Sequence, residues 1–94
     1  MYWVYMIKND FNDLYVGITD NPEQRLKYHN EKRGALFTKR ARSQDGRGIF
    51  HIVFLEQHPS LAAARQREIQ IKKWRREKKE NLIDRYTSGL SKVS

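Results

Sequence analysis

The chain has 94 residues and no cysteine, and its 19 Lys and Arg residues outnumber its 11 Asp and Glu residues, which leaves a formal net charge of +8. This length suits a single domain with a modest core, and the composition excludes disulfides and thiolate metal sites. No apolar run approaches the roughly 20 residues that span a bilayer. The first ten residues do not have the pattern of a signal peptide, so we expect a cytoplasmic protein with no membrane partner.

The first two expected elements are strands over residues 2–7 and 14–18, which are rich in aromatic and β-branched residues and flank a stretch of turn formers. They predict a β-hairpin. Strand alternation allows Tyr5 to share a side of the sheet with Tyr15 and Gly17. Taken alone, the two tyrosines are best interpreted as a hydrophobic cross-strand pair.

A helix is expected over about residues 22–32, because Asn21 is a good N-cap and Pro22 suits the first helical position. Arg25 and His29 lie one turn apart and therefore share a face of this helix. Taken singly, they are a solvated arginine and a surface histidine.

The remaining elements follow at lengths typical of a small domain. Residues 30–48 predict a long loop, and the apolar run 49–56 predicts the central or best-buried strand. A helix over residues 61–74 and a short helix over residues 76–86 are expected next. Residues 87–94 are predicted to form a frayed C-terminal tail. The resulting order β-β-α-β-α-α indicates an α+β fold, a small sheet flanked by helices.

Glu68 is the most informative single residue of the expected helix 61–74. Its position falls on the arc of Leu61, Ala64 and Ile71, which should face the core. A carboxylate there is costly unless it is paired or binds a metal ion. An ion pair with Lys72, one turn later, explains Glu68 equally well.

The positive charge is concentrated in two clusters, which favours a polyanion such as nucleic acid as partner over a merely soluble surface. Trp74 lies inside the second cluster, where packing is a better explanation than base stacking. The first cluster contains Arg33, Lys39, Arg40, Arg42 and Arg47, and the second contains Lys72, Lys73, Arg75, Arg76, Lys78 and Lys79.

Together, phenol, guanidinium, imidazole and carboxylate groups on a basic domain supply the roles that phosphodiester cleavage requires. With these residue types in these positions, the sequence resembles the GIY-YIG endonuclease superfamily. The blocks "VYMI", "YVGIT", "NPEQRLKYHN" and "REIQIKKWRREKKENLI" occur in the order and spacing of that family over about residues 2–84. The chain is most similar to small stand-alone bacterial members, close to the catalytic domains of excision-repair and structure-selective nucleases. The resemblance implies a nuclease domain over 1–86 with a three-stranded, largely antiparallel sheet.

The resemblance also implies roles for the hairpin residues. Tyr5 and Tyr15 match the motif tyrosines that line the active site, and Tyr5 is the preferred candidate for the general base. Gly17 matches the glycine whose position has no room for a side chain. Two departures are the Trp-Val pair that precedes Tyr5, where the motif has Gly-Ile, and Ile18, where some relatives have lysine.

Further roles are implied for the helices. Arg25 matches an arginine that contacts the scissile phosphate, and His29 a supporting histidine. Glu68 matches the glutamate that binds one divalent ion, Mg²⁺ or Mn²⁺, and the resemblance therefore favours the metal over the ion pair. Asn81 lies near the position of a site asparagine in some relatives.

The resemblance thus implies a divalent-metal-dependent DNA endonuclease, with a role in repair or recombination and with branched or nicked DNA among its candidate substrates. The basic residues Lys39, Arg40, Arg42, Lys72, Lys73, Arg75 and Arg76 would hold flanking phosphates. The alternatives are a nuclease fold that binds nucleic acid without cutting it and an adaptor for an acidic partner. A partner protein that supplies specificity is also compatible with the sequence.

Overall fold

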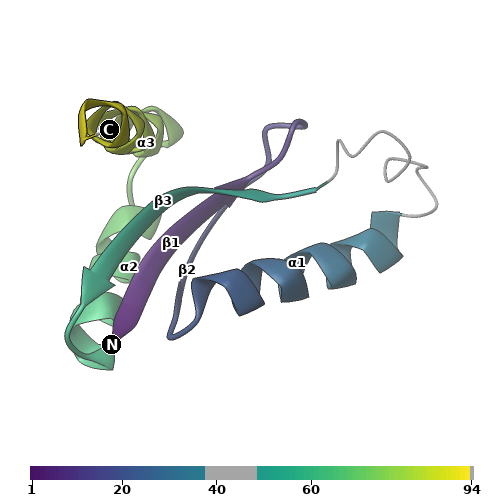
Figure 1. Cartoon of the computed structure of the whole chain (residues 1–94), viewed down its shortest axis with the longest axis horizontal. Helices are drawn as coiled ribbons and strands as arrows, with labels where there is room; N and C mark the ends of the chain where they lie inside the picture. The colour runs from purple at the N-terminus through teal and green to yellow at the C-terminus, as the bar shows by residue number, and fades with distance from the viewer. Residues whose placement is uncertain (38–48, 94) are drawn as a thin grey trace.

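A computed structural model describes residues 1–37 and 49–93. The strands within this part form one antiparallel sheet in the order β2-β1-β3. The expected α+β class and the order β-β-α-β-α-α are confirmed (Figure 1). The elements are β1 (Tyr2–Lys8), β2 (Leu14–Thr19), α1 (Pro22–Phe37), β3 (His51–His58), α2 (Leu61–Lys72) and α3 (Arg76–Val93).

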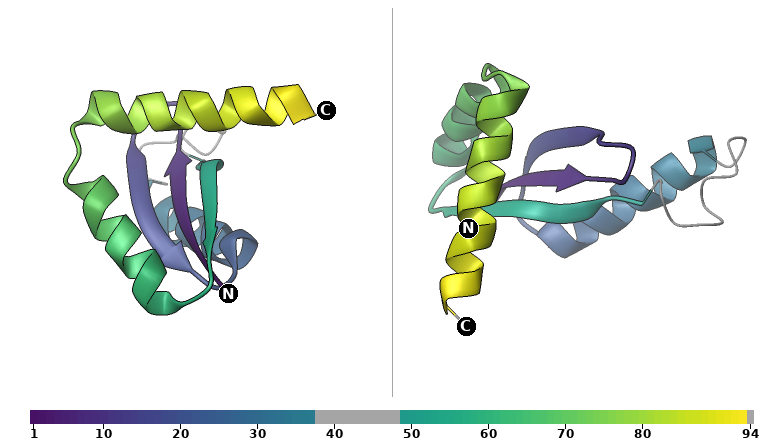
Figure 2. Two further views of the ribbon diagram at one scale, coloured as in Figure 1. Left: turned by 90° about the vertical axis from the view of Figure 1, so that its left-hand side faces the viewer. Right: turned by 90° about the horizontal axis from the view of Figure 1, so that it is seen from above.

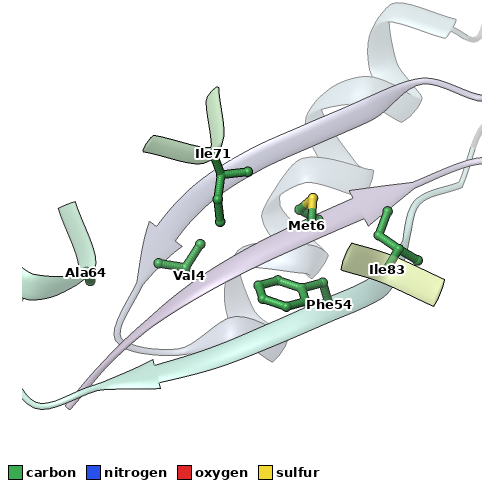
Figure 3. Close-up of a cluster of buried hydrophobic side chains, with 6 residues drawn as sticks. All are labelled: Val4, Met6, Phe54, Ala64, Ile71 and Ile83. Atoms are coloured by element: carbon green, nitrogen blue, oxygen red, sulfur yellow. The ribbon is translucent and has the colours of Figure 1, made fainter. Parts of the chain in front are cut away.

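Helices cover both faces of the sheet. In the left panel of Figure 2, α2 runs beside β2, α3 crosses the end of the sheet, and α1 lies behind it. The larger core forms where α2 and α3 meet the strands (Figure 3). Its buried members are Val4, Met6, Phe54, Ala64, Ile71 and Ile83.

β1 is the central strand, so the prediction that residues 49–56 form the central or best-buried strand is wrong. Val4 and Met6 face the larger core, whereas Tyr5 and Ile7 face α1, and all four are buried. Within the described residues, β3 pairs only with β1, and Phe54 is its one buried residue. The apolar run of β3 is a local feature of its sequence. The place of a strand in the sheet depends instead on the distant strands with which it pairs.

Capping side chains set the start of two helices, and the cap of the first is the expected one. Asn21 Oδ1 accepts a hydrogen bond of 3.2 Å from the backbone N–H of Gln24, and α1 begins at Pro22. The Ser60 hydroxyl accepts one of 3.2 Å from the backbone N–H of Ala63, and α2 begins directly after it. Each cap satisfies a donor that the first helical turn leaves unpaired.

The helix ends differ from the predictions. α1 continues to Phe37 instead of ending near residue 32, and residues 38–48 of the expected loop lie outside the described part of the chain. α3 continues to Val93, so residues 87–93 are helical and not a frayed tail. The apolar residues at 82, 83, 86, 90 and 93 continue a helical period through this segment, and this outweighs its weak helix formers. Within residues 1–37 and 49–93, no helix has the length and apolar character needed to cross a membrane.

The β1–β2 connection fixes the register of the hairpin. The buried Asn9 side chain accepts hydrogen bonds from the backbone N–H groups of Phe11 (3.1 Å) and Asp13 (3.0 Å). Asn12 takes a left-handed conformation with φ of 71°, which asparagine tolerates. This turn places Tyr5 opposite Gly17 and Ile7 opposite Tyr15.

Candidate active site

Tyr5 and Gly17 meet across the β1–β2 pair. Tyr5 is 4% exposed and its phenol lies over the glycine. A Cβ atom at residue 17 would lie 2.6 Å from the Tyr5 oxygen, closer than any side chain tolerates. Tyr5 and Gly17 both line a pocket beside β2, which is an edge strand.

Tyr15 does not stack directly on Tyr5, because it pairs with Ile7 one step along the hairpin. Both tyrosines instead contact His29 of α1. Tyr5 Oη and His29 Nε2 are 2.9 Å apart and share a hydrogen bond. The ring centroid of Tyr15 lies 5.5 Å from that of His29. The simple aromatic pair is therefore replaced by a phenol–imidazole–phenol group.

α1 brings Arg25 to the same place as His29, as their one-turn spacing predicts. The guanidinium carbon of Arg25 lies 5.3 Å from the centroid of the Tyr28 ring, a cation–π contact that orients the side chain. Arg25 itself remains exposed. An exposed, oriented guanidinium is available to an anion that enters from the edge of the sheet.

α2 supplies the carboxylate from the other side. The Glu68 side chain is only 12% exposed, and its Oε2 lies 3.2 Å from Lys72 Nζ. The ion pair that the sequence left open is therefore present, and Glu68 still lines the pocket with the tyrosines. Leu61 is 42% exposed, so the apolar arc of α2 is narrower than predicted and rests on Ala64 and Ile71.

A pocket of about 260 Å³ at the β2 edge collects all six residues that the sequence assigned to the site. Arg65 also lines it and was missed, although it lies one turn before Glu68 and hence on the same helix face. The lining residues are Tyr5, Tyr15, Val16, Gly17, Ile18, Arg25, His29, Arg65, Glu68 and Lys72.

The donor atoms of this pocket fit a hard divalent cation that is only partly enclosed by protein. Glu68 offers a carboxylate, and Mg²⁺ characteristically binds through one or two carboxylates while it keeps waters and contacts substrate phosphates. Within the described residues, no group of three or more His, Cys, Asp or Glu side chains forms a closed metal site. A site of the structural zinc type, with four protein ligands, is therefore not built in this part of the chain.

The basic residues assigned to nucleic-acid binding do not share one role. Lys72 lines the pocket, and Lys73 and Arg75 lie exposed at the junction of α2 and α3. Arg76 is engaged within the protein, because its guanidinium donates to Glu80 (2.8 Å) and to a loop carbonyl of the hairpin (2.7 Å). The predicted residues Lys39, Arg40 and Arg42 lie outside the described part of the chain.

Trp74 is half-buried and packs against the larger core, as the packing interpretation predicts. Arg67 and Lys78 also contact its ring, at 5.4 and 4.3 Å from the centroid. Asn81 lines a different surface hollow from the Glu68 pocket, together with Arg75, Glu77 and Lys78.

An antiparallel sheet with two tyrosines of neighbouring strands at one pocket, a glycine beneath one of them and a glutamate on a later helix defines a class of nuclease domain. The family model of the GIY-YIG catalytic domain matches residues 1–81. The chain belongs to the GIY-YIG family, as its sequence blocks predict.

Among the relatives that it matches are UPF0213 proteins of similar size. The chain is 39% identical over 83 residues to one from Clostridium perfringens, which covers 88% of this chain and 83% of the relative. It is 35% identical over 83 residues to one from Staphylococcus haemolyticus, covering 88% and 94%. A third, from Haloquadratum walsbyi, is 34% identical over 86 residues, covering 92% and 90%. No solved structure gives a significant match.

Proposed function

We propose that this protein is a divalent-metal-dependent DNA endonuclease that hydrolyses phosphodiester bonds, with a role in DNA repair or recombination in the cytoplasm. The observation that carries the proposal is the meeting of Tyr5, His29, Arg25 and Glu68 around one pocket at the sheet edge. Its positive lining and its opening at an edge strand suit a phosphodiester of a long polyanion.

Tyr5 is the group that receives the proton of the attacking water. Tyr5 Oη and His29 Nε2 share a hydrogen bond of 2.9 Å, and the mechanism uses the tautomer in which Nε2 accepts it. As the water oxygen forms its bond to phosphorus, its proton passes to Tyr5 Oη and the phenol proton passes to His29 Nε2. Because the proton moves on to the imidazole, Tyr5 does not have to become a free phenolate.

Arg25 and Glu68 act on the phosphate itself. Arg25 donates to the non-bridging oxygens, whose negative charge grows as the water oxygen forms its bond to phosphorus. Glu68 would hold one Mg²⁺ or Mn²⁺ ion, which would supply Lewis-acid polarisation of the phosphate and stabilisation of the leaving oxygen. Lys72 Nζ lies 3.2 Å from Glu68 Oε2 and holds the carboxylate at the pocket wall.

The deciding experiment is a cleavage assay with labelled branched, nicked and intact duplex DNA in the presence of Mg²⁺ or Mn²⁺. We expect the wild type to cut at least one substrate, and Tyr5→Phe and Glu68→Gln each to reduce kcat by about 10² to 10⁴-fold. Circular dichroism and thermal melting control for folding of the variants.

The proposal would be contradicted if the wild type cut none of the substrates, either alone or with an added partner protein. Salt-sensitive DNA binding without cleavage would then identify a nuclease fold that has become a binding module, because phosphate contacts give a steep salt dependence. Weak binding that does not respond to salt would instead favour an adaptor for an acidic protein.

A further inference from the structure

The pocket contains more positive charge than one phosphodiester balances. Arg25, Arg65 and Lys72 line it, and Glu68 is the one carboxylate among its described lining residues. Each phosphodiester of a nucleic acid carries a single negative charge. A divalent ion on Glu68 would increase the excess further, so the pocket is suited to at least two consecutive phosphates.

Arg65 is the cation whose place within the protein is not otherwise explained. Lys72 is paired with Glu68, and Arg25 lies against the Tyr28 ring. Within residues 1–37 and 49–93, Arg65 makes no ion pair and remains exposed at the pocket wall.

The neighbouring arginine of α2 differs from Arg65 in this respect. Arg67 donates to Glu56 (3.0 Å) and to Gln70 (3.1 Å), and it also contacts the Trp74 ring. Arg67 thus ties α2 to β3 and stabilises the fold. Arg65, two residues earlier, points to the opposite side of the helix and makes no comparable ion pair in the described part of the chain.

The position of Arg65 relative to Glu68 indicates which phosphate it meets. The two residues are three apart on one helix face, which places them about 4.5 Å apart along the helix axis. Arg25 approaches the same pocket from α1, on the far side of β2. Arg25 and Glu68 thus line the pocket from helices on the two faces of the sheet, whereas Arg65 lies one turn from Glu68 along α2.

We propose that Arg65 binds the phosphate adjacent to the scissile one on the cut strand, so that this strand runs along α2. This inference rests on the proposed nuclease function and adds a second phosphate subsite to it. Arg65 has no part in the proton transfer, and its effect is to hold the register of the strand over Glu68.

The test combines a protein variant with a substrate variant. Oligonucleotides carry an uncharged methylphosphonate at the phosphate on either side of the cleavage site, and wild type is compared with Arg65→Ala. We expect Arg65→Ala to reduce kcat/KM about tenfold and to lower the salt slope of DNA affinity by about 0.9. One flanking methylphosphonate should cost the wild type a similar factor but cost Arg65→Ala almost nothing further, because both changes remove the same interaction.

Arg85→Ala is the matched control, since Arg85 is an exposed arginine of α3 that does not line the pocket. Its cleavage and its response to methylphosphonates should equal those of the wild type. Additive losses in Arg65→Ala for both flanking positions would overturn the proposal, as would a loss in Arg65→Ala no larger than in Arg85→Ala. The affinities of the same protein and substrate variants are also measured by fluorescence anisotropy without metal. These affinities test the phosphate subsite even if the wild type binds DNA without cutting it, in which case only the proposed cleavage fails.

Discussion

At the scale of single residues, Gly17 and Tyr5 act as one unit. The structure explains the glycine by a contact and not by an unusual backbone conformation, because the Tyr5 phenol occupies the volume of a side chain at residue 17. The same contact directs the phenol toward the edge of the sheet, where Tyr5 Oη and His29 Nε2 share a hydrogen bond. The chemistry of Tyr5 therefore depends on an absent methyl group on the neighbouring strand.

Gly17→Ala should both destabilise the fold and displace Tyr5. The new Cβ would lie 2.6 Å from Tyr5 Oη, and a rigid buried ring cannot yield without moving its neighbours. We expect a loss of about 1 to 3 kcal/mol in the free energy of unfolding, measured by urea denaturation. Gly89→Ala in α3 is the control, because no atom beyond the backbone of its own helical turns and its chain neighbours lies within 4 Å of the added Cβ in the described part of the chain, and the change should stabilise the helix by about 0.5 to 1 kcal/mol. Equal stability of Gly17→Ala and wild type would contradict the close contact.

The Tyr5–His29 hydrogen bond makes a separate prediction about turnover. Because His29 Nε2 takes up the phenol proton in the proposed mechanism, His29→Gln should lower kcat by about 10² to 10⁴-fold at neutral pH in the cleavage assay. An unchanged kcat in His29→Gln would remove His29 from the proton path.

At the scale of elements, Glu80 joins α3 to the hairpin. Lys8 at the end of β1 donates to both Glu80 oxygens, at 2.9 and 3.0 Å, and Arg76 donates to one of them at 2.8 Å. Arg76 also donates to the carbonyl of Asn12 in the β1–β2 loop. These contacts hold the first turn of α3 against the end of the sheet. They also show why Arg76, assigned to nucleic-acid binding from its sequence cluster, has a role within the fold.

Glu80→Gln should weaken the protein in a pH-dependent way. The hydrogen bond from Lys8 lowers the pKa of Glu80 below its ordinary value of 4.5, against a smaller opposing effect of burial, and Arg76 lowers it further. A carboxyl group whose pKa is depressed by folding stabilises the folded state above its unfolded pKa, and this stability is lost as the pH falls through the folded pKa. We therefore expect Glu80→Gln to cost about 0.5 to 1 kcal/mol at neutral pH and almost nothing well below pH 4.5.

Thermal melting across pH measures this difference. Glu77→Gln is the matched control, since Glu77 is an exposed acid in the first turn of α3 that forms no ion pair within the described residues. A destabilisation by Glu80→Gln that persists unchanged at low pH would show that the contribution is not electrostatic.

At the scale of the whole molecule, the predictable features are those that depend on local sequence. Asn21 and Ser60 mark two helix starts because capping involves only the next three residues. The central place of β1 was not predictable, because it depends on pairing with strands on both sides. The continuation of α3 past residue 86 was missed because weak helix formers obscure its apolar period.

The candidate site, too, was predictable only where local spacing determines it. The one-turn spacing predicted that Arg25 lies beside His29, but spacing did not decide whether Glu68 forms an ion pair or binds a metal ion. The structure contains the ion pair and also brings Glu68 into the pocket. Only the fold reveals that Arg65 lies on the pocket wall, because an arginine in a basic helix has no distinguishing local signal.

The distribution of cations over the molecule leads to a last prediction on DNA affinity. Arg76 and Lys78 are engaged with Glu80 and the Trp74 ring, whereas Lys73 and Arg75 are exposed at the α2–α3 junction without an ion pair in the described part of the chain. We expect the double variant Lys73→Glu, Arg75→Glu to weaken binding to all DNA sequences alike, and to reduce the slope of log K against log salt by about 0.9 for each phosphate that the variant no longer neutralises. Anisotropy titrations over a range of salt measure both quantities. A weakening confined to some sequences would indicate that this junction reads bases, because contacts to phosphates carry no sequence information directly.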